Sequence, residues 1–429
     1  MDSMLTRDTH PASNSVPPIS VVAAAFLILN RFAQIKRISF RSRTAYMKHY
    51  FMQADAFFLA VMADRDRAQN HPGSDFMVFW YSMRKILLLL LCLPIFAMCA
   101  VAAEEQLQPL PVPVSNNAVA GIKVNGQLLV YSMTGIGSKK TWDSVTNAAY
   151  ALNVKYDTWT AIKPVPGSGR LGATAAGVKE QVFLIGGYVP DPQGEQAIVP
   201  DVSIYEPVAL RWYRGAELPI AVRDSVSGVY KDRYVYVIGG FSKNGPTNQV
   251  QLYDSETDKW TSATPSPGLP VFGHSGGIVN DSIVYVGGAV ASSGKPGFTP
   301  SDEAWMGKID RKDPRKIEWS KLPLPPSAAR YRIAAGASEK DQRIYFAGGS
   351  DKVYEFNGIG LDGTPAEPSP VTFAYNVKGS AWETIQQNAP TPSMDHRGMA
   401  VSSDGLIIVG GMVSGQKVVA SVELLPKSK

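Results

Sequence analysis

Cysteine and histidine are scarce in the part of this sequence that has the composition of a folded domain. Residues 104–429 contain no cysteine, since Cys92 and Cys99 lie upstream, and only two histidines, His274 and His396. This scarcity excludes disulfides and a Cys/His zinc site, and it leaves too few imidazoles for a multi-histidine copper site. Nucleophile-elbow, P-loop and dinucleotide-binding motifs are absent as well. We therefore expect no metal and no cofactor.

The same region also lacks an excess of charge of either sign. The full chain of 429 residues carries a formal net charge of +5. Of its 42 basic residues, nine precede residue 83 and two lie in 83–103, which leaves 31 against 31 acidic residues. A neutral domain has no electrostatic reason to bind nucleic acid or an anionic membrane. We expect neither as a partner.

Residues 83–103 have the pattern of a secretory signal peptide. An arginine and a lysine begin the segment, an apolar run follows, and small residues lead up to Ala103. Cleavage after Ala102 or Ala103 would yield a secreted or periplasmic protein with no stable membrane insertion. Residues 1–82 contain no repeat and are interpreted as a disordered extension or the product of a misplaced start. The alternative is a genuine extension with 83–103 as an anchor, although the apolar run is short for a span.

Short apolar stretches that end in a glycine pair recur along residues 104–429. The pairs are Gly186-Gly187, Gly239-Gly240, Gly287-Gly288, Gly348-Gly349 and Gly410-Gly411. The steps between their second glycines are 53, 48, 61 and 62 residues, and a weaker copy at 128–131 leads into Gly135 and Gly137. A period near 50 residues with one apolar strand per unit is typical of a repeat protein.

A second feature is in phase with the glycine pairs. Tyrosine precedes tryptophan by seven residues at Tyr205 and Trp212, Tyr253 and Trp260, and Tyr375 and Trp382, while Trp159 and Trp319 occupy the same place in their units. With these residues the chain resembles the kelch-repeat family over roughly residues 104–429. The resemblance implies an all-β, six-bladed β-propeller with four-stranded antiparallel blades, in which the aromatics fill the wedges between blades.

The second unit shows how each blade should be built. We expect its strands at Gly172 to Val178, at Gln181 to Gly187, at Asp201 to Glu206 and from Arg211 onward. The second strand is apolar at nearly every position, so it must be covered on both faces. The glycine pair that ends it indicates positive φ or a close approach of another backbone.

The last unit stops after Leu425, before a fourth strand of its own. Residues 104–116 resemble the tail of a unit, because Leu110 to Pro113 is similar to the proline-rich stretch after Trp319. We therefore expect the N-terminal segment to supply the outer strand of the last blade. Such a closure removes open sheet edges.

Polar residues gather where each first strand begins. They are Arg170, Arg223, Asp224, His274, Arg330, Arg332, His396 and Arg397, with Asp395 beside the last two. In an antiparallel blade this point lies at the same end as the loops between the second and third strands, which are long at 189–200, 289–302 and 350–370. Arginines and long loops should thus meet at one mouth of the ring, where they suit a carboxylate or sugar hydroxyls. The alternative is that these arginines tie neighbouring blades together through carbonyl groups.

The layout is also similar to that of bacterial N-acetylneuraminate epimerases, which are sialic acid mutarotases. In that family a glutamate and an arginine flank the segment equivalent to Lys295-Pro296-Gly297. Here those places hold Ala289 or Val290, and Phe298 or Thr299. Only Asp302 or Glu303 could replace the acid, from a shifted position. A galactose oxidase-like copper site with a cysteine-modified tyrosine cannot be built without cysteine.

Two functional hypotheses follow. The first is a non-enzymatic propeller that binds a small carbohydrate or an envelope protein at one mouth. The second is a sugar mutarotase with a rearranged active site, and it requires a carboxylate able to act as general acid and base.

Overall fold

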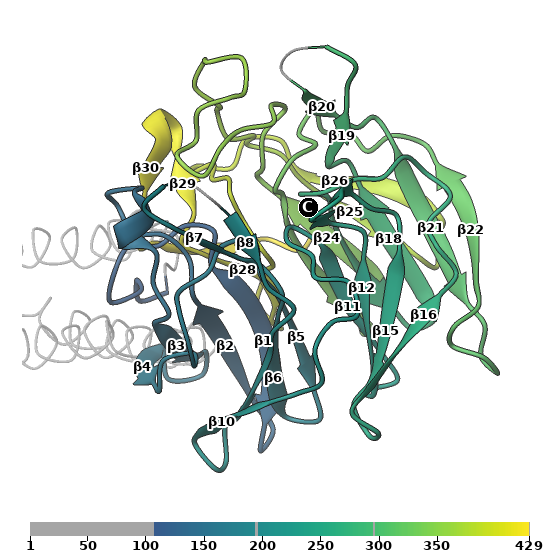
Figure 1. Ribbon diagram of the computed structural model, residues 1–429, viewed down its shortest axis with the longest axis horizontal. Helices are drawn as coiled ribbons and strands as arrows, with labels where there is room; N and C mark the ends of the chain where they lie inside the picture. The colour runs from purple at the N-terminus through teal and green to yellow at the C-terminus, as the bar shows by residue number, and fades with distance from the viewer. Residues whose placement is uncertain (1–106, 194–195, 295–296, 429) are drawn as a thin grey trace, which may run out of the picture. The chain divides into compact units, whose positions relative to one another are not determined.

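The computed structural model describes residues 107–428 except 194–195 and 295–296. These residues belong to one compact unit that contains five four-stranded antiparallel sheets and one three-stranded sheet. Figure 1 shows the sheets as the blades of a propeller. The predicted six-bladed all-β fold is confirmed. The predicted extension and signal peptide lie outside the described residues.

We number the blades 1 to 6 along the chain, and each contains a first strand and a second strand. The first strands are β1 (Ala118–Val124), β5 (Thr174–Val178), β11 (Val226–Tyr230), β17 (Ser275–Val279), β23 (Ala334–Ser338) and β27 (Ala400–Val401). The second strands are β2 (Gln127–Met133), β6 (Gln181–Ile185), β12 (Tyr234–Ile238), β18 (Ser282–Val286), β24 (Arg343–Ala347) and β28 (Leu406–Val409).

Third strands follow in every blade and fourth strands in the first five. The third strands are β3 (Ala149–Asn153), β9 (Val202–Glu206), β15 (Val250–Asp254), β21 (Ala304–Ile309), β25 (Thr372–Asn376) and β31 (Val422–Leu425). The fourth strands are β4 (Thr158–Ile162), β10 (Arg211–Arg214), β16 (Lys259–Ala263), β22 (Ile317–Leu322) and β26 (Ala381–Gln386). The strands expected in the second unit match β5, β6, β9 and β10 to within two residues at each end.

Short hairpins and 3-10 turns occur within the loops between second and third strands. The hairpins are β7 (Tyr188–Pro190) with β8 (Gln196–Ile198), β13 (Phe241–Ser242) with β14 (Gly245–Pro246), β19 (Ala289–Ala291) with β20 (Phe298–Pro300), and β29 (Met412–Val413) with β30 (Lys417–Val418). The 3-10 turns are η1 (Trp142–Ser144) and η2 (Ser414–Gln416). We call this end of the ring the loop end, and the opposite end, with the turns between first and second strands, the turn end.

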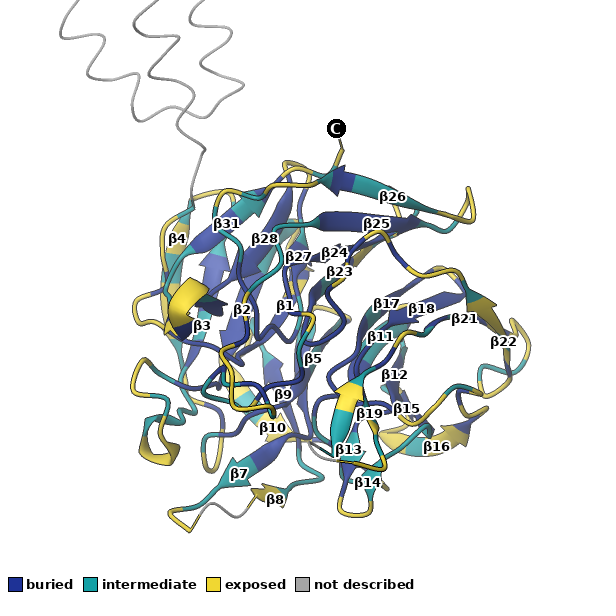
Figure 2. Ribbon diagram, turned by 90° about the horizontal axis from the view of Figure 1, so that it is seen from above, coloured by how far each residue is buried: buried dark blue, intermediate teal, exposed yellow. Residues whose placement is uncertain are grey.

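Burial is greatest in the second strands and falls toward the rim, as Figure 2 shows for blades 3 and 4. All five residues of β18 are buried, whereas β22 is largely exposed on its outer side. The first strands of successive blades lie against one another, and β27 contacts β1, so the first strands surround the axis. A second strand between neighbouring blades is covered on both faces, which explains why its sequence is continuously apolar.

The glycine pairs serve both purposes that the sequence indicated. Gly186 and Gly187 adopt φ of 62° and 97°, a region that costs other residues free energy. A Cβ on Gly187 would lie 2.7 Å from the carbonyl oxygen of Leu171. A side chain at this point would therefore clash with the segment just before β5, the first strand of the same blade.

The repeated aromatic residues join neighbouring blades. Tyr253 and Trp260 face each other across β15 and β16, with ring centroids 5.0 Å apart. The indole Nε1 of Trp260 donates a hydrogen bond of 2.8 Å to the carbonyl oxygen of Ala216 in the preceding blade. Trp212 and Trp382 make the equivalent bond to Lys163 and Pro323. These contacts favour a structural role for the aromatic repeat.

The seam between blades 1 and 6 contains the equivalent tryptophan hydrogen bond. Trp159 of blade 1 donates its indole hydrogen bond to the carbonyl oxygen of Gln108, at 2.8 Å. Leu107 forms an antiparallel bridge with Val422 of β31, and the buried Leu110 packs in the adjoining core. The described part of the N-terminal segment thus lies beside the third strand of blade 6. That it supplies the missing outer strand stays a prediction, because residues 104–106 lie outside the described part of the chain.

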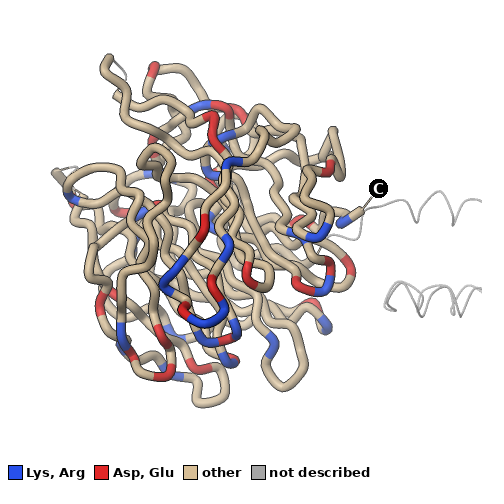
Figure 3. Tube along the Cα trace, turned by 90° about the vertical axis from the view of Figure 1, so that its right-hand side faces the viewer, with Lys and Arg blue, Asp and Glu red and all other residues tan. Residues whose placement is uncertain are grey.

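The surface offers no large region of one charge on the side seen in Figure 3, where basic and acidic residues are interspersed. Among the described residues, no helix is long and apolar enough to cross a membrane. Within the same residues, no group of three or more His, Asp or Glu side chains is arranged to hold a metal ion.

Candidate ligand-binding site

A belt of six equivalent residues surrounds the axis just before the first strands. In each blade, one residue just before the first strand forms an isolated β-bridge with the segment that follows the second strand. The residue after it has a left-handed backbone conformation. These next residues are Asn116, Gly172, Asp224, Gly273, Arg332 and Asp395, with φ between 53° and 66°. We call them the axial belt. Left-handed φ is uncommon outside glycine and asparagine, so Arg332 is held there by its surroundings.

Backbone hydrogen bonds pass from one belt residue to the next and hold this strained geometry. The amide of Asp224 donates to Gly172, the amide of Gly273 to Asp224 and the amide of Arg332 to Gly273, at 2.7, 2.7 and 2.8 Å. The amide of Asn116 donates to the carbonyl of Asp395 at 3.1 Å, which connects blade 1 to blade 6. The belt therefore fixes the side chains of different blades relative to one another.

Two buried aspartates of the belt bind three arginines. Asp224 accepts a hydrogen bond of 2.6 Å from Arg223 and pairs with Arg397 and, at 3.6 Å, with Arg332. Asp395 accepts one of 2.9 Å from Arg332 and lies 3.7 Å from Arg397. Both carboxylates are inaccessible to solvent. We call these five residues the axial cluster.

The arginines of the axial cluster favour the ionised form of Asp224. Burial alone would raise the pKa of Asp224, but the charges of Arg397, Arg332 and Arg223 outweigh it and hold this pKa far below its ordinary value. Burial lowers the pKa of His274 and of His396 to about 4, so both imidazoles next to the axial cluster are neutral at pH 7. Asp224 is thus ionised, and the two histidines are uncharged.

The other predicted site residues lie apart from the axial cluster. Arg170 donates to the hydroxyl of Ser203 at 2.9 Å and to two carbonyl oxygens of its own blade. Arg330 donates to the carbonyls of Ser327 and Ala329 and pairs with Asp302 at 3.1 Å. Arg330 of blade 5 contacts Asp302 of blade 4, whereas the hydrogen bonds of Arg170 stay within its own blade and do not tie it to a neighbour.

The two histidines lie next to the axial cluster and are largely buried. His274 lies edge-on to Tyr285, with ring centroids 5.3 Å apart. The Nε2 atom of His396 lies 2.9 Å from the hydroxyl of Ser393. Both histidines line the cavity described below.

The loop end, expected to be an open mouth, is covered by aromatic side chains. The guanidinium of Arg223 lies 4.4 Å from the ring centroid of Phe241, 5.0 Å from that of Tyr188 and 5.5 Å from that of Phe272. Arg332 lies in the same way against Tyr331, at 4.8 Å. The arginines and the long loops do meet, as expected, but the loops cover the arginines.

The longest loop, 350–370 of blade 5, contributes most to this cover, and we call it the strap. Its Phe356 packs against a buried cluster of Ile136, Leu171 and Tyr188 in blades 1 and 2, which are not neighbours of blade 5 in the ring. The amine of Lys140 in blade 1 donates to the carbonyl of Asn357 at 3.2 Å. The strap therefore spans the loop end and connects distant blades across it.

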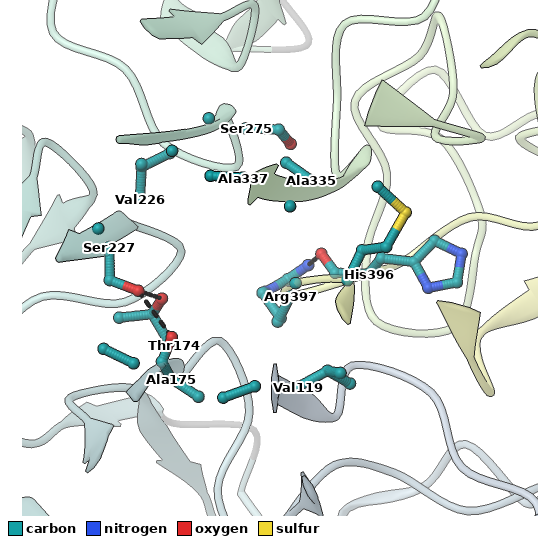
Figure 4. A pocket seen from close by; sticks show the side chains of 18 of the residues that line it. Val119, Thr174, Ala175, Val226, Ser227, Ser275, Ala335, Ala337, His396 and Arg397 are labelled. Atoms are coloured by element: carbon teal, nitrogen blue, oxygen red, sulfur yellow. Dashed lines mark hydrogen bonds between the residues drawn. The ribbon is translucent and has the colours of Figure 1, made fainter. Parts of the chain in front are cut away.

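A cavity of about 410 Å³ lies on the other side of the axial belt, along the axis. Asp224, Arg332 and Arg397 line its inner end, and the exposed Asp232 and Glu339 line its outer rim at the turn end. Its wall is made of small residues from the first strands, among them Gly121, Ala175, Gly177, Ser227, Ala335 and Ala337. Figure 4 shows Arg397 reaching toward the middle of this cavity. We call it the axial cavity.

The wall offers hydroxyl and carbonyl groups to a ligand. The hydroxyls of Thr174 and Ser227 lie 2.7 Å apart, and Ser227 donates to the carbonyl of Ala175 at 2.9 Å, as drawn in Figure 4. Sequence reasoning did not single out these wall residues. It also noted Asp395 without assigning it to the site, although Asp395 occupies the repeat position of Asp224. Aligning the positions before each first strand would have found both aspartates.

Comparison with known proteins agrees with this architecture. Residues 101–288 match the family described as KLHDC2/KLHL20/DRC7 Kelch-repeats domain. The described domain is a kelch-repeat β-propeller. The structure of YjhT has the same fold, with a TM-score of 0.60 and 20% sequence identity over 75% of this chain and 97% of that one. At this identity the likeness concerns the fold alone.

Curated relatives are Kelch-like proteins. Kelch-like protein 15 of Homo sapiens is 23% identical over 245 residues, which is 55% of this chain and 37% of the relative. Kelch-like protein terF of Aspergillus terreus is 25% identical over 221 residues, 50% of this chain and 44% of the relative. Kelch-like protein 23 of Homo sapiens is 26% identical over 320 residues, 66% and 51% respectively. The kelch domain thus spans about half or less of these relatives, and it is a ligand-binding or protein-interaction fold.

Proposed function

We propose that this kelch propeller binds a small carbohydrate in its axial cavity and does not transform it. The observation that carries the proposal is a cavity that opens at the turn end, has a wall of hydroxyls and exposed main chain, and ends at charged groups. Its volume of about 410 Å³ lies within the range of about 300–1,000 Å³ for small-molecule sites. Sugar hydroxyls both donate and accept hydrogen bonds, which suits such a wall.

The state of the buried and ion-paired carboxylates argues against their use in mutarotase chemistry. Asp224 and Asp395 do lie beside arginines, but both are buried in ion pairs. A carboxylate whose pKa is held far below neutral takes up a proton poorly and is a weak general base. Asp302 pairs with Arg330, and Glu303 pairs with Lys321 at 2.8 Å, outside the cavity. None of these four acids is available for proton transfer on a sugar in the axial cavity.

We propose in addition that the protein is exported. The support is the signal-like pattern of residues 83–103, and the expected product begins at Ala103 or Glu104. Mass spectrometry of the protein from the periplasm or culture medium measures its first residue. Intact protein beginning at Met1 in that fraction would contradict export by cleavage.

A panel of neutral and acidic monosaccharides, measured by calorimetry and thermal shift, tests the binding function. Ala337 is exposed on the cavity wall, so Ala337→Tyr should fill the bore and abolish binding. Ala209→Tyr adds the same side chain on an exposed turn outside the cavity and should leave binding unchanged. Failure of every sugar to bind, or equal loss in both variants, would refute the proposal and favour a protein ligand instead. Polarimetry with each bound sugar tests for mutarotation, which we expect to be absent.

A further inference from the structure

The axial cluster has an excess of positive charge. Three arginines face two aspartates, which leaves one positive charge among side chains that are almost fully buried. Arg332 and Arg397 are 3% and 8% exposed. A buried charge without a counter-charge is costly, because the protein interior solvates it poorly. The axial cluster therefore has a reason to take up an anion.

No neighbouring side chain removes this excess. His274 and His396 are neutral because burial lowers their pKa to about 4, and burial raises the pKa of Tyr331 to about 12. The exposed Asp232 and Glu339 line the far rim of the cavity, where water screens them. The carbonyl of His396 accepts a hydrogen bond of 2.8 Å from Arg397, which supplies a dipole and not a charge.

The geometry also shows where an anion would be held. Arg397 points into the axial cavity (Figure 4), and its Nε–H makes no hydrogen bond within the described residues. Arg332 lines the same inner end, but its Nε is directed toward Asp224, whose Oδ1 lies 3.6 Å away. Arg397 thus brings a nearly buried guanidinium group with an unsatisfied donor to the inner end of the axial cavity, which is reached from the turn end.

We propose that the inner end of the axial cavity is a binding site for one small monovalent anion, a carboxylate or a halide, held by the guanidinium group of Arg397. One negative charge neutralises the axial cluster, whereas a dianion would replace a positive excess by a negative one. Guanidinium groups bind carboxylates through parallel N–H donors, so a carboxylate fits best. The anion is either a free ion or the carboxylate of a larger molecule in the cavity.

The test measures thermal unfolding and calorimetric binding of the full protein at constant ionic strength. The probes are acetate, chloride and sulfate, with a bulky sulfonate buffer as reference. A ligand that binds only the folded state raises its stability with concentration. Acetate and chloride should raise the melting temperature more than sulfate does. Identical effects of all salts would show ionic-strength screening alone and would overturn the proposal.

Two charge-matched variants separate direct contact from general attraction. Arg397→Gln and Arg223→Gln each remove one positive charge from the axial cluster, but only Arg397 lines the cavity. We expect Arg397→Gln to weaken acetate binding by about tenfold or more, and Arg223→Gln to weaken it by less than about threefold. Equal losses in the two variants would overturn the assignment to Arg397. Arg397→Lys keeps the charge and should retain chloride binding. This variant replaces Arg397→Gln in the experiment if Arg397→Gln fails to fold.

Glucuronate and glucose distinguish a free anion from the carboxylate of a sugar, because they differ by one carboxylate. Tighter binding of glucuronate that Arg397→Gln abolishes would show that the anion site holds part of the cavity ligand. Acetate binding without any sugar binding would support the anion site and refute the proposed carbohydrate function. Equal binding of both sugars, without an acetate effect, would support the carbohydrate function and refute the anion site.

Discussion

The two ends of the axis differ in what closes them. At the loop end, Tyr188, Phe241 and Phe272 cover Arg223, and the strap crosses above them from blade 5 to blades 1 and 2. At the turn end, small residues leave the axial cavity open. Arg332 therefore faces the aromatic ring of Tyr331 on one side and lines a ligand-sized space on the other. A row of cations in a sequence does not by itself show which side solvent reaches.

The difference follows from the connections at each end. Loops between second and third strands are long and carry apolar residues such as Phe298 and Tyr354, which pack into one apolar cluster. Turns between first and second strands are short. In blade 3 only Lys231 to Arg233 separate the strands, and Lys231 and Asp232 both adopt positive φ, as a tight hairpin requires. Such polar turns offer no apolar side chains that could cover the axial cavity.

The largest expected effect comes from opening the seam between blades 1 and 6, which would disrupt both ends at once. Deleting residues 104–113 removes the buried Leu110, the bridge from Leu107 to Val422 and the acceptor of the Trp159 indole. We expect a loss of about 5 kcal/mol in the free energy of unfolding, from lost burial and hydrogen bonds. Urea denaturation measures it. An unchanged midpoint and slope would show that the seam does not depend on this segment.

Removing a carboxylate from the axial cluster tests the closed end. Asp224→Ala leaves three buried arginines facing only Asp395, so we expect a loss of about 3–5 kcal/mol in stability. Asp224→Asn keeps the shape and separates the loss of charge from the loss of packing. Chemical denaturation of both variants measures the effect. A cost below about 1 kcal/mol for both would mean that solvent reaches the axial cluster and that the loop end is not closed.

Weakening the strap should make the two ends more alike. Phe356→Ala removes a partly buried ring from the core it forms with Ile136 and Tyr188, at a cost of about 2 kcal/mol. Hydrogen exchange should then speed up at the amides of the loop end and stay unchanged at the turn end. Val208→Ala, on a residue 69% exposed, is the control and should cost less than about 0.5 kcal/mol. Equal acceleration at both ends would contradict the role of the strap as a cover.

The smallest effect concerns pH and the buried histidines. Burial places the folded-state pKa of His274 and of His396 at about 4, below the ordinary value of about 6.5 in an unfolded chain. Protonation therefore favours the unfolded state, and this stabilisation is complete above pH 6.5 and is lost as the pH falls toward 4. We expect each histidine to contribute a loss of about 1 kcal/mol per pH unit in that window, read from melting curves. His274→Gln should flatten the slope, and an unchanged slope would contradict the assignment.

Local residue patterns were enough to predict the fold. The glycine pairs gave the ends of the second strands, and the spacing of Tyr253 and Trp260 placed them opposite each other on β15 and β16. These features repeat because each blade must pack against its neighbours in the same way. The axial cluster was predictable in part, since Arg223, Asp224, Arg332 and Arg397 were all selected from their position before a first strand. Their pairing was not predictable, because Asp224 meets Arg397 only when the ring brings blades 3 and 6 together.

The sequence by itself determined that this protein is a six-bladed kelch propeller without cysteine chemistry in its propeller domain, because strand periodicity and residue type are local properties. Only the tertiary structure decided which charges neutralise one another and which end of the axis is open. Those outcomes depend on contacts between residues hundreds of positions apart, such as Asn116 with Asp395 and Lys140 with Asn357. They also depend on the way the strap folds back over the axis. Contacts of this kind have no local signature, since the same loop sequence could equally lie outside the ring.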